Sequence, residues 1–330
     1  MILVVAEQRD GRLNRATWEA VVAAQRLADG ASITIVSLGG SAGASNSPSI
    51  ANVPHELAAA GVGDVLVVAD PALEPYTPDA YVTALAQAIA FLSPRVVALP
   101  HTYQTRDFAP ALAARLNAPL ITDVTGFRGA GRDATFIRPM FRGKLAADVR
   151  AVGSGPCLVT FQIGAFRADQ VRKGAVASAV TELPVTIDRS AIRQTPEAPF
   201  QEVQQAVDLS QAARIVAVGR GIKSREQLPV AEALAKAMGA ELAASRPICD
   251  SGWLPMERQI GSSGQTVAPT LYVALGISGA IQHLVGMKGA RTIVAINKDA
   301  DAPIFEVADY GIVGDLFEIA PAIVAELEKP

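Results

Sequence analysis

The segment LYVALGISGAIQHLVGM, residues 271–287, combines a strand pattern, a glycine turn and the start of a helix pattern. Its first part is a short apolar run typical of a buried strand, which breaks at residues 276–279. Helical spacing resumes after the turn, with Gln282 and His283 just inside the helix. We expect Ser278 to cap this helix, whose first N–H groups and dipole favour an anion. The segment therefore predicts a phosphate site at the end of a strand.

Alternating strand and helix patterns extend from this segment through most of the chain. In the first half, strands are predicted at 2–7, 32–38, 64–69 and 95–99, with helices at 14–28, 53–60 and 79–90. This alternation predicts βαβ units and a parallel sheet. After residue 122, strand patterns at 134–141, 145–152 and 157–162 are separated by RGK and GSGP turns. These three patterns predict an antiparallel addition to the first sheet.

A change in composition and in hydrophobic periodicity separates two predicted domains. The stretch ELPVTIDRSAIRQTPEAPFQEVQQAVDLSQA contains three prolines and has weak periodicity, which is typical of a linker. We place the boundary near residue 206, giving an N-terminal α/β domain with its linker at 1–205 and a second domain at 206–330. Strands resume at 215–218, 241–243, 271–275, 292–296 and 310–313. The predicted fold is α/β with two domains, the second a Rossmann-like parallel sheet.

Composition narrows the classes of function. The net charge of −3 and the scattered Lys and Arg residues argue against nucleic acid or an acidic membrane surface as a partner. Cys157 and Cys249 form no CxxC motif, and the chain has only 3 His residues, so we expect no metal site and no Ser-His-Asp triad. No apolar run reaches the roughly 20 residues of a membrane span, so we expect no membrane insertion. Without a targeting pattern at the start, the cytoplasm is expected, and a processed mitochondrial matrix protein stays open.

Polar or glycine-rich turns follow every strand predicted in the second domain. They are GRG at 219–221, SR at 245–246, GISG at 276–279, NKD at 297–299 and GDL at 314–316. Because parallel strands end at one edge of the sheet, these turns favour one extended ligand there. Arg220 suits diphosphate or ribityl oxygens, Asn297 offers amide groups, and Asp315 resembles the acid that receives a ribose hydroxyl. Gly279 and Ala280 lack bulk, so a pyrophosphate could approach their backbone.

Each motif also has a plainer interpretation. Most Gly-x-x-Gly turns only let a helix pack back on its strand, and GRG lacks the third glycine of a dinucleotide fingerprint. The loop IGSSGQT, residues 260–266, could be an ordinary turn. His55 suits a helix surface, and His101 suits an interface better than catalysis. His283 could be a packed helix residue, although it lies a turn inside the expected anion site.

Several long segments closely resemble the α subunit of electron-transfer flavoprotein. They are LYVALGISGAIQHLVGM, TIVAINKDADAPIFEVADYGIVGDLFEIAPAI, ILVVAEQRDGRLNRATWEAVVAAQRLA and VVALPHTYQTRDFAPALAARLNAPLITDV. The resemblance covers nearly the whole chain and implies a heterodimer of α and β subunits. It implies that the N-terminal domain contacts the β subunit and that the second domain binds FAD. The β subunit would carry AMP or, in bifurcating members, a second FAD.

The resemblance also implies the flavin contacts, motif by motif. It places Arg246 over the flavin ring, and Gln282 and His283 at the flavin end. One departure is the loop IGSSG, where the family has VGQTG: Ser263 keeps a hydroxyl near flavin N5, but Ser262 loses an amide. By the resemblance, this departure bears on the flavin potential and the choice of redox partner, and not on FAD binding. The implied contacts are Arg220, Ser245, Arg246, Ile260, Gly261, Ser262, Ser263, Ser278, Gly279, Ala280, Ile281, Gln282, His283, Asn297, Asp299, Asp315 and Leu316.

The expected function is that of an electron carrier with no substrate chemistry of its own. It would take electrons from flavin dehydrogenases and pass them to a quinone oxidoreductase or another acceptor through transient contacts. One alternative is a subunit of an electron-bifurcating flavoprotein. Another is an NAD(P)-dependent oxidoreductase, which needs an acid/base group where the second domain offers only His283 and scattered carboxylates. A flavin absorption band would separate the carrier from this oxidoreductase. The third alternative is a nucleotide-binding module without redox activity, against which the positive charge of Arg246 near the expected flavin ring argues.

Overall fold

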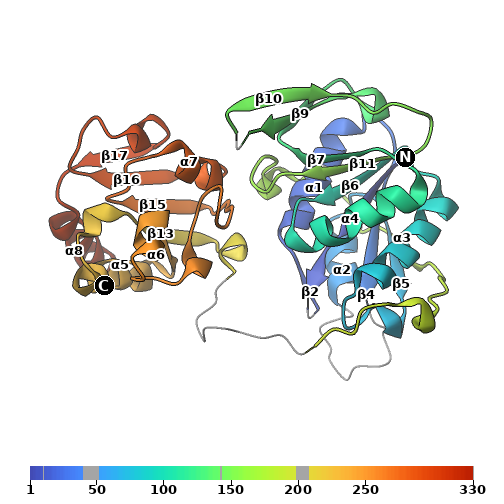
Figure 1. Ribbon diagram of the computed structural model, residues 1–330, viewed down its shortest axis with the longest axis horizontal. Helices are drawn as coiled ribbons and strands as arrows, with labels where there is room; N and C mark the ends of the chain where they lie inside the picture. Colours follow the sequence, from blue (N-terminus) through green and yellow to red (C-terminus); the bar gives the residue numbers. More distant parts are fainter. Residues whose placement is uncertain (10, 40–51, 142, 198–207, 330) are drawn as a thin grey trace. The chain divides into compact units, whose positions relative to one another are not determined.

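The structure is a computed structural model that describes residues 1–9, 11–39, 52–141, 143–197 and 208–329. The chain divides into two compact units, Met1–Ala198 and Pro199–Pro330 (Figure 1). The domain boundary that we place near residue 206 lies outside the described residues.

A seven-stranded parallel sheet forms the centre of the first unit. Its order is β12-β5-β4-β1-β6-β11-β7, and Ile2 of β1 pairs with Ile33 of β4 on one side and Val96 of β6 on the other. All residues of β1, β6 and β11 are buried, as expected for strands covered on both faces. The strands are β1 (Ile2–Ala6), β4 (Ile33–Gly39), β5 (Asp64–Ala69), β6 (Val96–Pro100), β7 (Leu120–Val124), β11 (Cys157–Phe161) and β12 (Val180–Glu182).

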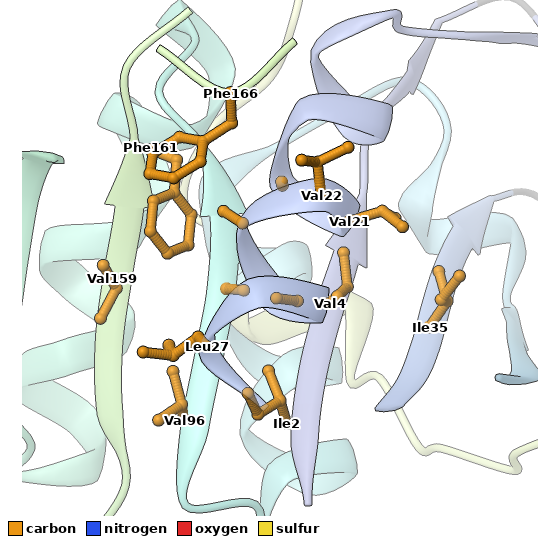
Figure 2. Packing of buried hydrophobic residues seen from close by; sticks show 14 of the residues in the cluster. Ile2, Val4, Val21, Val22, Leu27, Ile35, Val96, Val159, Phe161 and Phe166 are labelled. Atoms are coloured by element: carbon orange, nitrogen blue, oxygen red, sulfur yellow. The ribbon is translucent and has the colours of Figure 1, made fainter. Parts of the chain in front are cut away.

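Helices cover both faces of this sheet because its strands present apolar side chains alternately to each face. In β1, Ile2 and Val4 join the cluster that contains α1, whereas Leu3 and Val5 join the cluster that contains α3 and α4. Figure 2 shows the first cluster, with Leu27 of α1 beside Val96 and Val159. The helices are α1 (Ala16–Leu27), α2 (Asn52–Ala59), α3 (Pro78–Leu92) and α4 (Tyr103–Leu116), and β2 (Gln8–Arg9) pairs with β3 (Arg12–Leu13).

The predicted antiparallel addition is right for two of its three strands, but these strands form a sheet of their own and do not extend the first sheet. Strands β8 (Gly126–Arg128), β9 (Thr135–Met140) and β10 (Leu145–Val149) form a separate three-stranded antiparallel sheet. The third predicted segment, 157–162, does not belong to it. That segment is β11, which lies parallel between β6 and β7 in the main sheet. A local strand pattern indicates burial but not whether the strand runs parallel or antiparallel to its neighbours. The pattern alone could therefore not distinguish a place in the antiparallel sheet from one in the main sheet.

A five-stranded parallel sheet forms the second unit, which confirms the predicted Rossmann-like architecture. Its order is β14-β13-β15-β16-β17, the doubly wound order in which the second strand lies outside the first. The topological switch point of such a sheet lies between its first and third strands, here β13 and β15. The strands are β13 (Arg214–Val218), β14 (Glu241–Ala244), β15 (Leu271–Leu275), β16 (Ile293–Asn297) and β17 (Tyr310–Val313).

Alternating side chains again bury both faces of the second sheet. Val216 and Val218 of β13 join a cluster with α5 and α8, whereas Ile215 and Ala217 join a cluster that includes Met287 of α7. The helices of this unit are α5 (Leu228–Met238), α6 (Arg246–Asp250), α7 (Ile281–Met287) and α8 (Leu316–Leu327). None of the helices in the described ranges is both long and apolar enough to cross a bilayer.

Candidate functional site

The five predicted turns lie at one edge of the second sheet, because every strand pairing in it is parallel. The two central turns touch. The Gly221 N–H donates to the Gly276 carbonyl at 3.0 Å, and the Gly219 N–H donates to the Leu275 carbonyl at 2.9 Å. The turns after β13 and β15 therefore form one surface at the switch point.

Glycine is required where these two turns meet. A Cβ atom on Gly219 would lie 2.4 Å from the Gly276 carbonyl oxygen, and one on Gly221 would lie 2.6 Å from Gly276 Cα. Gly276 itself has φ +60°, and its Cβ would lie 3.0 Å from Cδ2 of Leu316, which is buried. Gly219, Gly221 and Gly276 thus serve this backbone contact, whether or not a ligand is bound.

The start of α7 differs from the expectation. The helix begins at Ile281, and Ala280 occupies its N-cap position without a side-chain hydrogen bond. Ser278 is exposed, and its carbonyl accepts from the Ile304 N–H at 3.1 Å, so Ser278 does not cap the helix as predicted. Gly279 has φ +89°, and its Cβ would lie 2.2 Å from Ile304 N. Gly279 is therefore required by the chain's own backbone, which explains the glycine without a pyrophosphate.

The loop IGSSGQT packs along α7 and is more than an isolated turn. The Ser262 N–H donates to the Gln282 carbonyl at 2.7 Å, and the Val267 N–H donates to the Gly286 carbonyl at 2.8 Å. Gly261 has φ +140°, and its Cβ would lie 2.7 Å from the Gln282 carbonyl oxygen. The structure thus places buried Ile260, Gly261 and the exposed Ser262 and Ser263 beside the exposed Ile281 and Gln282 and the buried His283.

His283 is held from within the sheet by a residue that the sequence does not single out. Its Nε2 atom lies 2.8 Å from the hydroxyl of Tyr272, a fully buried residue of β15. Its Nδ1 atom is buried and has no hydrogen-bond partner among the described residues. Burial lowers the pKa of His283 to about 4, an effect that the Ile260 backbone partly opposes. The imidazole is therefore neutral at physiological pH.

A second buried polar atom without a partner lies next to the same loop. Gln259 is 1% exposed, and its Nε2 donates to Ser263 Oγ at 2.9 Å. Its Oε1 atom makes no hydrogen bond within the described part of the chain. Buried polar groups are nearly always hydrogen-bonded, so such atoms mark a place for a ligand or water. Gln259 carries no sequence signal beyond its position before the loop at 260–266, and Tyr272 none beyond its position in a predicted strand.

The side chains after the outer strands are engaged within the protein. Asn297 Nδ2 donates to the Ile277 carbonyl at 2.9 Å, which ties the turn after β16 to the turn after β15. Asp315 accepts from the Phe317 N–H at the start of α8 and pairs with Lys298 Nζ at 2.7 Å. Hydrogen bonding to Lys298 holds the pKa of Asp315 below its usual value. Asp299 accepts from the Asp301 N–H at 3.0 Å and closes its own turn.

The cationic side chains of the site face solvent. Arg246 is 64% exposed and pairs with Asp250 one turn along α6, with Nε and Oδ2 3.2 Å apart. Ser245 occupies the N-cap position of α6, and its N–H donates to the Val218 carbonyl at 2.9 Å. Arg220, in the GRG turn, is exposed. Both arginines are thus available to a ligand at this edge.

A doubly wound sheet with glycine turns at its switch point defines a nucleotide-binding class of protein. Comparison with known proteins gives the family. Residues 2–188 match the model of the electron transfer flavoprotein domain, and residues 208–288 match the electron transfer flavoprotein FAD-binding domain. The chain belongs to the electron transfer flavoprotein family, which confirms the resemblance, and it functions in electron transfer.

Relatives match along nearly the full length of the chain. The electron transfer flavoprotein subunit alpha of Bacillus subtilis is 36% identical over 99% of this chain and 97% of its own length. The subunit of the same name from Thermoanaerobacterium thermosaccharolyticum is 36% identical over 99% and 98%. The acryloyl-CoA reductase electron transfer subunit beta of Anaerotignum propionicum is 34% identical over 99% and 95%.

Proposed function

We propose that this chain is the FAD-carrying α subunit of a heterodimeric electron transfer flavoprotein. FAD would lie along the carboxyl edge of the five-stranded sheet, across the turns that follow its strands. The observation that carries this proposal is the pair of buried, unpartnered atoms beside the loop at 260–266, His283 Nδ1 and Gln259 Oε1. A flavin ring offers both acceptors and an N–H donor at its edge, so it can satisfy one atom of each kind.

The residues present offer partners for the phosphates and for the flavin ring of this cofactor. The phosphates would face Arg220 and the N–H groups of Ile281 and Gln282, which are the first two of α7 and have no intrahelical partners. The flavin ring would face the loop at 260–263, with Gln282, His283 and Arg246 around it. The bound FAD supplies the chemistry of accepting and releasing electrons, and the chain supplies position and electrostatics. No residue of the chain is assigned a bond-making step on a substrate.

An exposed apolar strand supports a protein partner for this unit. β17 is the last strand of its sheet, and Tyr310, Ile312 and Val313 are 65%, 37% and 59% exposed. An exposed apolar edge strand is a template for association. We assign this association to an electron transfer flavoprotein β subunit, which would carry AMP or a second FAD.

The proposal also includes transient partners and a location. Flavin dehydrogenases and a quinone oxidoreductase would be the transient partners. The location would be the cytoplasm, which cell fractionation tests.

Co-expression with the β subunit tests the partner. We expect a one-to-one complex and an α chain that aggregates when produced alone. A stable, flavin-loaded α monomer with no affinity for the β subunit would contradict the heterodimer.

Cofactor content tests the site. The purified complex should show a flavin absorption band, and the extracted nucleotide should include one FAD for each α chain. In Gly221→Ala, the added Cβ would meet Gly276, so we expect less bound FAD while the first unit keeps its stability. A colourless complex that binds NAD(P)H in place of FAD would overturn the proposal.

A further inference from the structure

The buried contact between Tyr272 and His283 joins the central strand of the second sheet to the helix at its edge. The phenol oxygen and Nε2 are 2.8 Å apart, and the two rings are tilted by 58° with centroids 6.2 Å apart. The residues are 0% and 6% exposed. The contact is thus a buried hydrogen bond between the phenol oxygen and a ring nitrogen, and not a stack of the two rings.

The direction of this hydrogen bond follows from what else the phenol can reach. Burial raises the pKa of Tyr272 well above its usual value, so the phenol keeps its proton. Among the described residues, His283 Nε2 is the hydrogen-bond partner of this hydroxyl. If Nε2 carried the hydrogen and donated it, the phenol proton would be left buried without an acceptor. The phenol therefore donates to Nε2, and a neutral imidazole with an accepting Nε2 carries its proton on Nδ1.

The surroundings of the other nitrogen agree with this assignment. The backbone of Ile260 raises the pKa of His283, as a hydrogen-bond acceptor does. Its N–H is already used, donating to the Ala244 carbonyl at 2.9 Å, so the acceptor is its carbonyl. Nδ1 has no hydrogen-bond partner within the described ranges. A proton on Nδ1 is therefore free to be donated to a ligand.

We propose that Tyr272 is a positioning residue that holds His283 in the neutral Nδ1–H form, so that the ring offers the flavin a hydrogen-bond donor. The proposal rests on the FAD site proposed above and adds the direction of this contact. A donor stabilises reduced flavin, which carries more negative charge, better than oxidised flavin, whereas an acceptor would do the opposite. Tyr272 would thus raise the flavin potential without touching the cofactor.

Nitrogen NMR tests the tautomer directly. The full chain with its β subunit is labelled with ¹⁵N-histidine, and the chain has only 3 His residues, so the signal lost in His283→Gln identifies this ring. We expect a protonated Nδ1 and an unprotonated Nε2, both before and after FAD is added. In Tyr272→Phe, the ratio of the Nδ1–H tautomer to the Nε2–H tautomer should fall by about two- to tenfold, the equivalent of one neutral hydrogen bond. A protonated Nε2 in the wild type, or a Tyr272→Phe spectrum unchanged from it, would overturn the proposal.

A redox titration of four proteins separates positioning from plain packing. Tyr272→Phe should lower the ratio of reduced to oxidised flavin about two- to tenfold at a fixed potential. The same change made in the His283→Gln background should have no effect, because Tyr272 acts through the imidazole. An equal fall of this ratio in both backgrounds would mean that Tyr272 acts only by packing in the core. If Tyr272→Phe does not fold, the wild-type NMR spectrum still decides the tautomer. If no FAD binds, the proposed function and the donor role fall, while the tautomer is still measured.

Discussion

Gln259 donates a hydrogen bond from Nε2 to Ser263 Oγ across 2.9 Å, from the residue that precedes the loop packed on α7 to a residue within it. Because the serine oxygen accepts this bond, its own hydrogen is free to point out of the loop. Ser263 stands at the position where the family resemblance places a threonine hydroxyl near flavin N5. A buried glutamine therefore orients the hydroxyl in the one loop that departs from the family pattern.

Ser263→Ala should reveal this orientation. The change leaves the Gln259 side chain with neither of its polar atoms paired, so the second unit should lose about 1 kcal/mol of unfolding free energy. Loss of the hydroxyl should also lower the flavin midpoint potential by roughly 20–60 mV, the equivalent of one neutral hydrogen bond. Ser263→Thr keeps the hydroxyl and is the matched control. Denaturation and redox titration of both variants measure these effects, and equal behaviour of Ala and Thr would contradict them.

Arg246→Ala should lower the flavin potential by tens of millivolts, because a positive charge near the ring favours the reduced form. The free energy of unfolding should change by less than about 0.5 kcal/mol, since the side chain is exposed and its ion pair with Asp250 lies on the surface. Asp250→Asn is the control: it keeps the arginine and removes its competitor, so the potential should rise or stay the same. A potential unaffected by Arg246→Ala would leave Arg246 as a surface ion-pair residue only.

Gly279→Ala should destabilise the second unit by about 3 kcal/mol or more. The new Cβ would require a strained backbone at φ +89° and would lie 2.2 Å from Ile304 N, a backbone atom that cannot turn away. Gly252→Ala in the same unit is the control, since Gly252 has φ +68° with nothing within 4 Å, and should cost only about 1–2 kcal/mol. Urea unfolding followed by Trp253 fluorescence in a Trp18→Phe background reports on this unit. If Gly279→Ala matched its control in stability and still lost FAD, a pyrophosphate contact would be the better explanation of the glycine.

Glu19 should make the first unit less stable as the pH rises from about 4.5 to about 7. Burial raises the pKa of this carboxyl from 4.5 to about 7, although the Gly164 N–H, 2.6 Å from Oε2, opposes the shift. The folded chain then binds more protons than the unfolded chain in this window, so the unfolding free energy falls with pH and levels off above pH 7. The loss should reach up to about 3 kcal/mol.

Glu19→Gln removes this titration while keeping the shape of the side chain. Urea unfolding followed by Trp18 fluorescence in a Trp253→Phe background should show a smaller slope against pH for the variant than for the parent. Parallel pH profiles for the two proteins would mean that Glu19 titrates normally in the folded chain.

Much of the second unit follows from local patterns. The predicted strands 271–275 and 310–313 coincide with β15, which is largely buried, and with β17, which is the exposed edge strand, because each is a short apolar run bounded by turn residues. In the first unit α4 has no counterpart among the predicted helices, although its buried residues include Thr105, Phe108 and Leu112 at helical spacing. The buried face begins on a threonine, and the exposed Pro110 is of a residue type that usually ends a helix, so the sequence hides the helical period.

The candidate site could also be predicted only in part. Convergence of the five turns follows from parallel strands and could be predicted. The pairs Tyr272–His283 and Gln259–Ser263 could not, because they depend on which side chains meet within the fold and not on any spacing in the sequence. The cap failed for a local reason: Gly279, with φ +89°, extends the turn so that α7 begins beyond the reach of Ser278.

The contact between the GRG and GISG turns makes three glycines, Gly219, Gly221 and Gly276, interdependent, because a methyl group on any of them would meet atoms of the opposite turn or of Leu316. Random mutagenesis should therefore find almost no tolerated single change at these positions. The turns after β16 and β17 are held by side-chain bonds of Asn297 and Asp315, which other hydrogen-bonding residues can replace. Engineering a different cofactor preference should thus begin at these outer turns.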